Sequence, residues 1–301
     1  MPSMETVAQW LSNHGLALTL AMTAIAFAAE AFAQRESASD QRHHWAITWR
    51  TNLLLFSATM AISWTIAPWL SPLLSTWLSG RDGALSLIDA PFALHVVMGF
   101  LLLDLGSYAI HRLFHRVGWL SRLHQVHHSD IAMNASTHFR QHPLSTIVTL
   151  ALQLPLLWVA GIPGVSWVLY ATLSAAIDLW HHADITPSPW VECALGGWLV
   201  TPGVHRLHHH PDRAVHDNNY GAALCVWDHL FRTYRKPDAS RREPTGVAGY
   251  PASAALSIRA CLLTPFTASP VASSNAASLI HTRKRASKYA KQPAVQHKKT
   301  S

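Results

Sequence analysis

Histidine is the residue that most clearly offers chemistry in this sequence. There are 21 copies, against 16 aspartates and glutamates together. Neutral imidazole is a ligand for iron, zinc, copper and nickel. Many of the copies recur at i, i+3 and i+4, a spacing that places side chains on one face of a helix. The clusters are His111-x3-His115, His124-x2-His127-His128, His138-x3-His142, His181-His182 and His205-x2-His208-His209-His210.

The number of clustered histidines indicates a metal centre. A buried histidine in an ordinary core needs a hydrogen-bond partner, so packing does not explain eight or more copies at ligand spacing. A surface run that binds metal adventitiously is the simplest alternative. Eight to ten nitrogen ligands exceed what one ion uses, so the pattern predicts two ions with four or five ligands each. The three cysteines form no CxxC pair, which argues against a thiolate zinc site and a disulfide scaffold.

The elements that position these histidines are membrane helices. The chain is 50% hydrophobic and 13% charged, against about 25% charged in an average soluble domain. Runs at 16–33, 53–78 and 91–110 are long enough to span a bilayer, whereas 144–160 and 165–180 are short and flank a Gly-Ile-Pro-Gly turn. We therefore predict an all-α integral membrane bundle of three full spans plus a short helical hairpin, with a histidine-rich helical cap.

Basic residues predict the orientation of the bundle. The first 15 residues hold no lysine or arginine, residues 34–50 hold three and residues 111–145 hold four. Arg206 and the residues beyond it hold 15 of the 23 basic side chains. The positive-inside rule then places the N-terminus outside and the histidine cap in the cytoplasm. Because the basic residues lie beside the membrane runs and in the C-terminal tail, nucleic-acid binding is not expected.

Composition divides the chain into four expected segments. Residues 1–90 would form N-terminal membrane helices, and residues 91–237 the histidine-bearing domain. Residues 238–280 are rich in Ala, Ser and Pro, and 250–266 could form one short amphipathic helix at the interface. Residues 281–301 are basic and polar, which is typical of a disordered tail.

The motifs resemble those of the fatty acid hydroxylase/sterol desaturase superfamily across residues 90–237. The matching stretches are Asp104–His115, Trp119–Asp130, Arg140-Gln-His142-Pro143, Thr201–His209, Asn219-Tyr220-Gly221 and Trp227–Tyr234. The resemblance implies an integral membrane di-iron oxidoreductase, with two Fe ions as cofactor and O2 as co-substrate. Such enzymes hydroxylate or desaturate lipids, and no catalytic residue is expected outside the metal centre.

The resemblance also implies a ligand set. The expected metal ligands are His111 and His115, then His124, His127 and His128, then His182, and finally His205, His208 and His209. His142, His181 and Asp178 are candidates for a ligand or for support of one. Asp184 stands where the family has an asparagine, and Asp178 stands where some members carry a further histidine, so the ligand count of one iron stays open.

Several polar residues are expected to support the ligands from behind. A metal-bound histidine usually donates its other N–H to a carboxylate or carbonyl, and the candidates for such support are Asp104, Arg140, Asn219 and Asp228. For Glu30, a helix contact or an interfacial position is favoured over catalysis. Trp167, Tyr170 and Trp180 could line an apolar channel or face the lipid, and the sequence leaves both open.

Electrons must come from another protein. The chain has no GxGxxG nucleotide motif and no His-Pro-Gly-Gly haem motif, so a ferredoxin, cytochrome or reductase is implied. The substrate would be a sterol, fatty acyl chain or related lipid that enters from the bilayer. The expected location is a bacterial inner membrane, or the endoplasmic reticulum in a eukaryote. The alternative is a histidine-rich membrane metal-binding or transport protein without redox chemistry; a non-catalytic family member is a third reading.

Overall fold

All regular elements that the structure describes are helices. The structure is a computed structural model that describes residues 4–33, 39–78, 83–185, 187–238 and 243–267. Within these ranges one isolated β-bridge pairs Leu199 with Leu224. The all-α prediction is therefore confirmed. The predicted basic tail, residues 281–301, lies outside the described residues.

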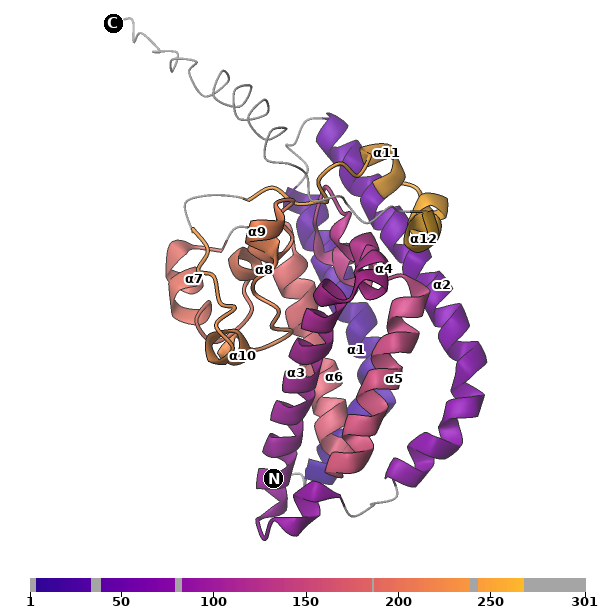
Figure 1. Ribbon diagram of the computed structural model, residues 1–301, viewed down its shortest axis with the longest axis vertical. Helices are drawn as coiled ribbons and strands as arrows, with labels where there is room; N and C mark the ends of the chain where they lie inside the picture. The colour runs from indigo at the N-terminus through magenta and orange to yellow at the C-terminus, as the bar shows by residue number, and fades with distance from the viewer. Residues whose placement is uncertain (1–3, 34–38, 79–82, 186, 239–242, 268–301) are drawn as a thin grey trace, which may run out of the picture. The chain divides into compact units, whose positions relative to one another are not determined.

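Five long helices make up the bundle. α3 packs against both α5 and α6, α1 packs against α6, and α2 packs against α5; Figure 1 shows α3, α5 and α6 running side by side. The histidines of α3 and α6 lie in the last turns of these helices. The bounds of the five are α1 Met4–Ala33, α2 Ser39–Leu78, α3 Phe92–Arg116, α5 Pro143–Ala160 and α6 Gly164–His182.

The long helices have the length and the surface of membrane spans. Among the described residues, α1, α2, α3 and α5 each contain a stretch long and apolar enough to cross a membrane. Large apolar side chains such as Ile25, Trp64 and Val159 stay at least 65% exposed, as expected where lipid is the surrounding solvent. The chain is thus an integral membrane protein.

The fourth and fifth apolar runs form the predicted hairpin. Gly161 ends α5 with a left-handed φ of 64°, a conformation that glycine adopts without cost, and Pro163 precedes α6. α5 has 18 residues, about 27 Å of helix, so it is a fourth candidate span where the sequence alone suggested a run too short to cross.

Short helices gather where α3 and α6 end (Figure 1). Their starts follow local rules: Ser188 and Thr201 each cap a helix whose first residue is proline. They form the predicted helical cap. Their bounds are α4 Gly118–His128, η3 Ala135–Phe139, α7 Pro189–Leu195, α8 Pro202–His208, α9 Arg213–His216, α10 Val226–Leu230, α11 Ala252–Ala255 and α12 Ile258–Thr267; η2, Ala84–Leu87, lies between α2 and α3.

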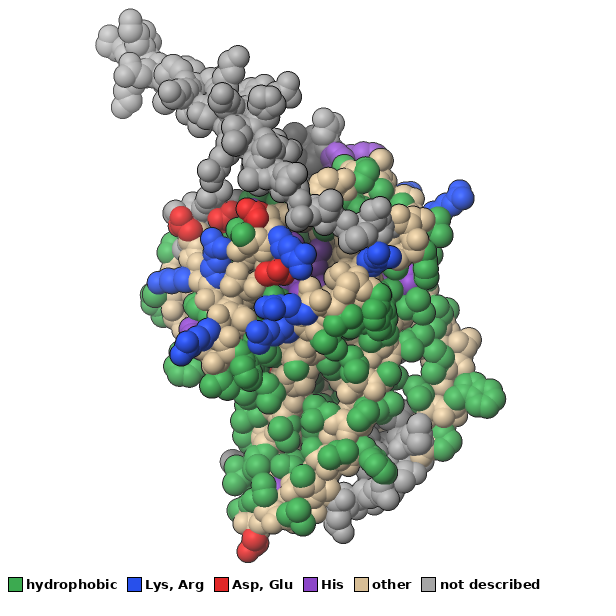
Figure 2. Space-filling model, viewed as in Figure 1, with side chains coloured by type: hydrophobic (Ala, Val, Ile, Leu, Met, Phe, Trp, Pro, Cys, Tyr) green, Lys and Arg blue, Asp and Glu red, His purple; other side chains and the backbone are tan. Residues whose placement is uncertain are grey.

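Charge divides the surface in the same way as the helices do. On the face shown in Figure 2, apolar side chains cover the long helices, whereas most Lys, Arg, Asp and Glu side chains lie over the short ones. Such a boundary is expected between a lipid-facing bundle and a water-facing cap. That this cap faces the cytoplasm stays a prediction from the positive-inside rule.

Glu30 is a buried contact between helices, as the sequence favoured. It lies in α1, is 2% exposed, and accepts hydrogen bonds from the indole N–H groups of Trp45 and Trp49 at 3.3 and 3.2 Å. It also accepts from the backbone N–H groups of Ala135 and Asp184, both at 2.8 Å. Its carboxylate therefore joins α1 and α2 to η3 and to the segment that follows α6.

Arg140 joins the C-terminal helices to α4. Its guanidinium donates to the backbone carbonyls of Val126 and Ala255 at 2.8 and 2.6 Å and to Asn52 Oδ1 at 2.8 Å. α12 packs along α4 and buries Cys261. The described part of the expected interfacial segment thus packs against the helix that carries three of the predicted ligands.

Candidate metal centre

The nine histidines predicted as ligands lie together at the cap end of the bundle. Their ligand nitrogens form two sets, and within each set the atoms lie within 4.8 Å of one another. The five-histidine group contains His111, His115, His124, His128 and His208. The four-histidine group contains His127, His182, His205 and His209.

Each HxxHH motif contributes to both groups. In α4, His124 and His128 belong to the five-histidine group and His127 to the four-histidine group. At α8 the assignment is reversed, with His205 and His209 in the four-histidine group and His208 in the other. Residues i and i+4 differ by about 40° around a helix, whereas i+3 lies about 100° from i+4. The two motifs therefore interlock and hold the two groups side by side.

Backbone carbonyls fix the orientation of three imidazoles. His111 Nδ1 lies 2.9 Å from the Tyr220 carbonyl, His208 Nδ1 lies 2.8 Å from that of Asn218, and His182 Nδ1 lies 2.7 Å from that of Asp178. A carbonyl oxygen only accepts, so Nδ1 must carry the proton in each ring. The Nε2 atom of each neutral ring then presents a lone pair.

These Nε2 atoms point at other imidazole nitrogens. His111 Nε2 lies 3.0 Å from His124 Nε2, and His182 Nε2 lies 3.0 Å from His205 Nε2 and 3.3 Å from His127 Nε2. Nitrogens bound at about 2.1 Å and at right angles around one ion would lie about 3.0 Å apart. His208 Nε2 is buried with no hydrogen-bond partner among the described residues. The donor set therefore fits bound metal ions.

Burial keeps the imidazoles neutral. Desolvation lowers the pKa of His127 to about 4, and it lowers the pKa of His124, His128, His205 and His209 well below the usual value. A neutral imidazole has a free lone pair, which is the form that binds a metal.

Two carboxylates lie beside histidines, one at His115 of the five-histidine group and one at His138 and His181, which belong to neither group. Asp217 lies 3.6 Å from His115 Nδ1 and also pairs with Arg213. Asp178 lies 3.1 Å from His181 Nε2 and 3.3 Å from His138 Nδ1.

The remaining candidate ligands lie beside the two groups. The His181 ring packs at 3.9 Å between centroids against that of His205, and with Asp178 and His182 it forms a further set of close donor atoms. His142 lies in neither histidine group: it caps α5 by accepting from the Leu144 N–H and lies 3.2 Å from the Leu262 carbonyl.

The candidate supporting residues act on the backbone around the histidines. Asp228 accepts from the N–H groups of Tyr220 and Gly221, both at 2.8 Å. Asp104 accepts from the Ala223 N–H at 3.2 Å and from the Trp227 indole at 2.8 Å. Both carboxylates thus hold the segment whose Tyr220 carbonyl orients His111.

Asn219 and Arg140 hold the two neighbouring stretches. Asn219 has a left-handed φ of 56°, which asparagine tolerates better than most residues, and it donates to the carbonyls of Val204 and Arg235. It stands next to Asn218, whose carbonyl orients His208. Arg140 reaches the Val126 carbonyl, one residue before His127.

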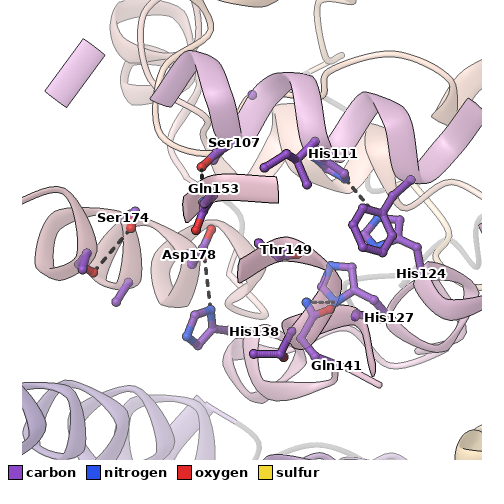
Figure 3. A pocket seen from close by; sticks show the side chains of 18 of the residues that line it. Ser107, His111, His124, His127, His138, Gln141, Thr149, Gln153, Ser174 and Asp178 are labelled. Atoms are coloured by element: carbon purple, nitrogen blue, oxygen red, sulfur yellow. Dashed lines mark hydrogen bonds and ion pairs between the residues drawn. The ribbon is translucent and has the colours of Figure 1, made fainter. Parts of the chain in front are cut away.

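A cavity of about 440 Å³ lies directly below the histidines. His111 and His124 of one group and His127, His182 and His205 of the other face it. Figure 3 shows His111, His124 and His127 along one side and Asp178 with its partner His138 along another. The sequence left open whether Trp167, Tyr170 and Trp180 line a channel or face the lipid. Trp167 and Tyr170 line the cavity, whereas Trp180 is not among its lining residues.

Several residues of the site escaped the sequence reasoning. The side-chain amide of Gln141 lies 3.2 Å from His127 Nδ1, and His216 joins His115 and Asp217 in a third set of donor atoms. Ser107 and Gln153 line the cavity and bond each other. The signal for Gln153 was present, since it follows Ser145 and Thr149 at steps of four in an otherwise apolar run.

The fold and the site define a class of protein: a helical membrane protein with two adjacent histidine groups above a cavity. Residues 96–233 match the fatty acid hydroxylase family. This segment contains both histidine groups, and its match to the family confirms the resemblance that the motifs predicted.

The names of the curated relatives describe enzymes that modify lipids. Ornithine lipid hydroxylase OlsE of Rhizobium tropici is 32% identical over 53% of this chain and 47% of its own length. Human alkylglycerol monooxygenase is 31% identical over 48% of this chain and 31% of its own. A Delta(7)-sterol 5(6)-desaturase of Candida dubliniensis is 27% identical over 46% and 33%. The matches thus span less than half of each of these relatives. No solved structure matches the chain.

Proposed function

We propose that this chain is a membrane-bound di-iron oxygenase that hydroxylates or desaturates a lipid. The observation that carries the proposal is the pair of histidine groups that face one cavity at the cap end of a membrane bundle. The match of residues 96–233 to the fatty acid hydroxylase family and the lipid-modifying relatives support it.

The five-histidine group would hold one iron and the four-histidine group the other. Imidazole suits iron, and all nine rings lie within two sets of close donor atoms. When bound there, two irons supply reductive activation of O2 for attack on a C–H bond. Hydroxylation of one C–H bond consumes O2, two electrons and two protons and releases one water, so a separate electron donor is required.

The chain itself would position the reactants. The carbonyls of Tyr220, Asn218 and Asp178 keep three imidazole protons on Nδ1, away from the metal side. The reacting lipid would lie between the cavity walls of α3, α5 and α6, where displacement of water by the lipid would limit side reactions. Trp167 and Ala171 of α6 offer apolar surface to the hydrocarbon.

The metal-transport alternative has less support. Transport needs a path of ionisable groups through the membrane. The family match and the names of the relatives point to lipid oxidation instead. Uptake of labelled iron into vesicles that contain the purified chain would revive the alternative.

Product analysis with a double variant tests the proposal. We expect His127→Ala/His208→Ala, which removes one ligand from each group, to abolish the oxidised lipid made by membranes expressing the unchanged chain. His229 is exposed and lies in neither group, so His229→Ala is the matched control. An unchanged lipid profile in the double variant, inserted at normal level, would refute the proposed function.

A further inference from the structure

The wall that α5 gives the cavity is polar. This helix carries four side chains with a hydroxyl or amide group, Ser145, Thr146, Thr149 and Gln153, and all four line the cavity. Ser145, Thr149 and Gln153 follow one another at steps of four and so share one helix face; we name them the α5 stripe. At 1.5 Å per residue the stripe is about 12 Å long.

Polar side chains such as those of the α5 stripe are unusual on a membrane helix. α5 is otherwise apolar and is one of the four candidate spans. Polar groups at membrane depth are costly unless they face protein partners or a cavity. Here the stripe faces away from lipid and towards the space below the metal ligands, where a substrate would lie.

Part of the stripe lacks a protein partner. Ser145 is 4% exposed, and its hydroxyl has no hydrogen-bond partner among the described residues. Leaving a buried hydroxyl unpaired costs free energy. Gln153, which also lines the cavity, donates to Ser107 of α3 at 3.3 Å (Figure 3), and this hydrogen bond does not use its amide oxygen, which is an acceptor. These groups can pair with a ligand that donates or accepts hydrogen bonds.

The charge of the lining restricts that ligand. None of the described residues that line the cavity is lysine or arginine. A phosphate or carboxylate beside the α5 stripe would therefore be buried without a cationic side chain to pair with, which is unfavourable. Asp178, the carboxylate of the lining, already pairs with His138 and His181. The cavity chemistry fits an uncharged polar group.

The cavity volume limits how much of a lipid enters. About 440 Å³ is typical of a site for one small molecule. It holds a segment of chain with one small polar group but not a whole phospholipid. The charged part of a larger lipid would remain outside the cavity.

We propose that the α5 stripe binds a neutral hydrogen-bonding group of the lipid substrate, such as a hydroxyl, an amide or an ester carbonyl. The stripe thereby determines substrate specificity and sets which carbon lies below the histidines. This inference rests on the proposed function and narrows its substrate class to lipids with such a group close to the reacting carbon.

Binding measurements without turnover test the inference. The full chain, loaded with iron in lipid nanodiscs and kept without reductant, is titrated with labelled 1-hexadecanol against hexadecane and hexadecyl phosphate as competitors. We expect hexadecanol to bind saturably and neither competitor to displace it at equal concentration. Thr149→Val/Gln153→Leu should weaken hexadecanol binding about 30-fold, because two hydrogen bonds of about 1 kcal/mol each are lost.

Two further variants separate a binding defect from a folding defect. Thr172→Val makes the same change on α6, where the hydroxyl bonds the Val168 carbonyl and does not line the cavity, and it should bind hexadecanol normally. Thr149→Ser/Gln153→Asn keeps both polar groups and should restore much of the affinity. Every variant should retain the iron content of the unchanged chain.

The outcomes distinguish this inference from the proposed function. Equal competition by hexadecane, tighter binding of hexadecyl phosphate, or normal hexadecanol binding by the double variant would each overturn the inference. The proposed function would survive any of these results if iron-loaded chain still oxidised a lipid. Absence of oxidised product with intact hexadecanol selectivity would instead reject the proposed function alone.

Discussion

The two histidine groups are built differently. In the five-histidine group, carbonyls orient His111 and His208, and Asp217 stands behind His115. In the four-histidine group a carbonyl orients His182 and the Gln141 amide lies beside His127. The Nδ1 atoms of His205 and His209 have no hydrogen-bond partner among the described residues, and in the five-histidine group the same holds for His128 Nδ1. Three of the four rings of the four-histidine group face the cavity, compared with two of the five in the other group.

The difference suggests a division of labour under the proposed function. Outer hydrogen bonds fix imidazoles and strengthen their hold on a metal, so we expect the five-histidine group to bind its ion more tightly. Catalytic metal sites keep a position open for water or substrate. The four-histidine group, with fewer ligands and more contact with the cavity, is the better candidate for that open position.

The largest expected effect comes from the smaller group. His205→Ala leaves three histidines there, so we expect the bound iron to fall from two ions to about one per chain and oxidised lipid to fall at least 100-fold, on the order of other losses of a catalytic group. Elemental analysis and lipid mass spectrometry measure both. Full iron content in this variant would show that the group does not depend on His205.

Removing one ligand from the larger group should cost less. His115→Ala leaves four histidines in the five-histidine group, so we expect nearly two irons per chain and a smaller loss of product than in His205→Ala. The two variants are compared at equal expression in the same membranes. A greater iron loss from His115→Ala than from His205→Ala would reverse the proposed order of affinities.

Replacing Asp217, the carboxylate beside His115 of the five-histidine group, should affect iron binding still less. Although burial raises the pKa of Asp217, hydrogen bonds with His115 and Arg213 outweigh it and hold the pKa at about 2, so the group is ionised at neutral pH. Asp217→Asn should weaken binding of one iron on the order of tenfold, measured by chelator competition. Asp212→Asn, which keeps the cap of α9, is the control and should behave like the unchanged chain.

The smallest effect on metal is expected from Glu30→Gln. Its carboxylate accepts four N–H groups, two of them in η3 and just after α6. An amide in its place turns one acceptor into a donor, and the expected loss is about 2 kcal/mol of unfolding free energy, or a Tm lower by roughly 4–8 °C. Iron content should stay near normal. An unchanged Tm would mean that the Glu30 contacts do not stabilise the bundle.

Sequence alone predicted the membrane bundle from its apolar runs and eight of the nine histidines from their local spacing, whereas the family resemblance added His182. The i, i+3, i+4 pattern identifies a shared helix face whatever the rest of the fold does. The division into two groups could not be predicted, because it depends on how α4 and α8 face each other. That arrangement sends His127 and His208, the middle histidines of the two motifs, to opposite groups.

Long-range contacts account for the other omissions. The packing of α12 on α4 depends on buried contacts of Arg140 with Ala255 and Cys261, more than 100 positions away. Asp104 was expected to support a ligand, and the structure adds that its partners are Ala223 and Trp227, not an imidazole. The spacing of the α5 stripe is present in the sequence, but only the structure shows that these three side chains line the cavity.

Iron content per chain tests the two-group centre most directly. It would be measured on detergent-purified protein grown with ample iron, beside His124→Ala/His128→Ala and His205→Ala/His209→Ala, which each remove two ligands from one group. We predict two irons in the unchanged chain, about one in each double variant and none when the four changes are combined. Equal iron in all four proteins, or no bound metal in the unchanged chain, would contradict a di-iron centre held by these histidines.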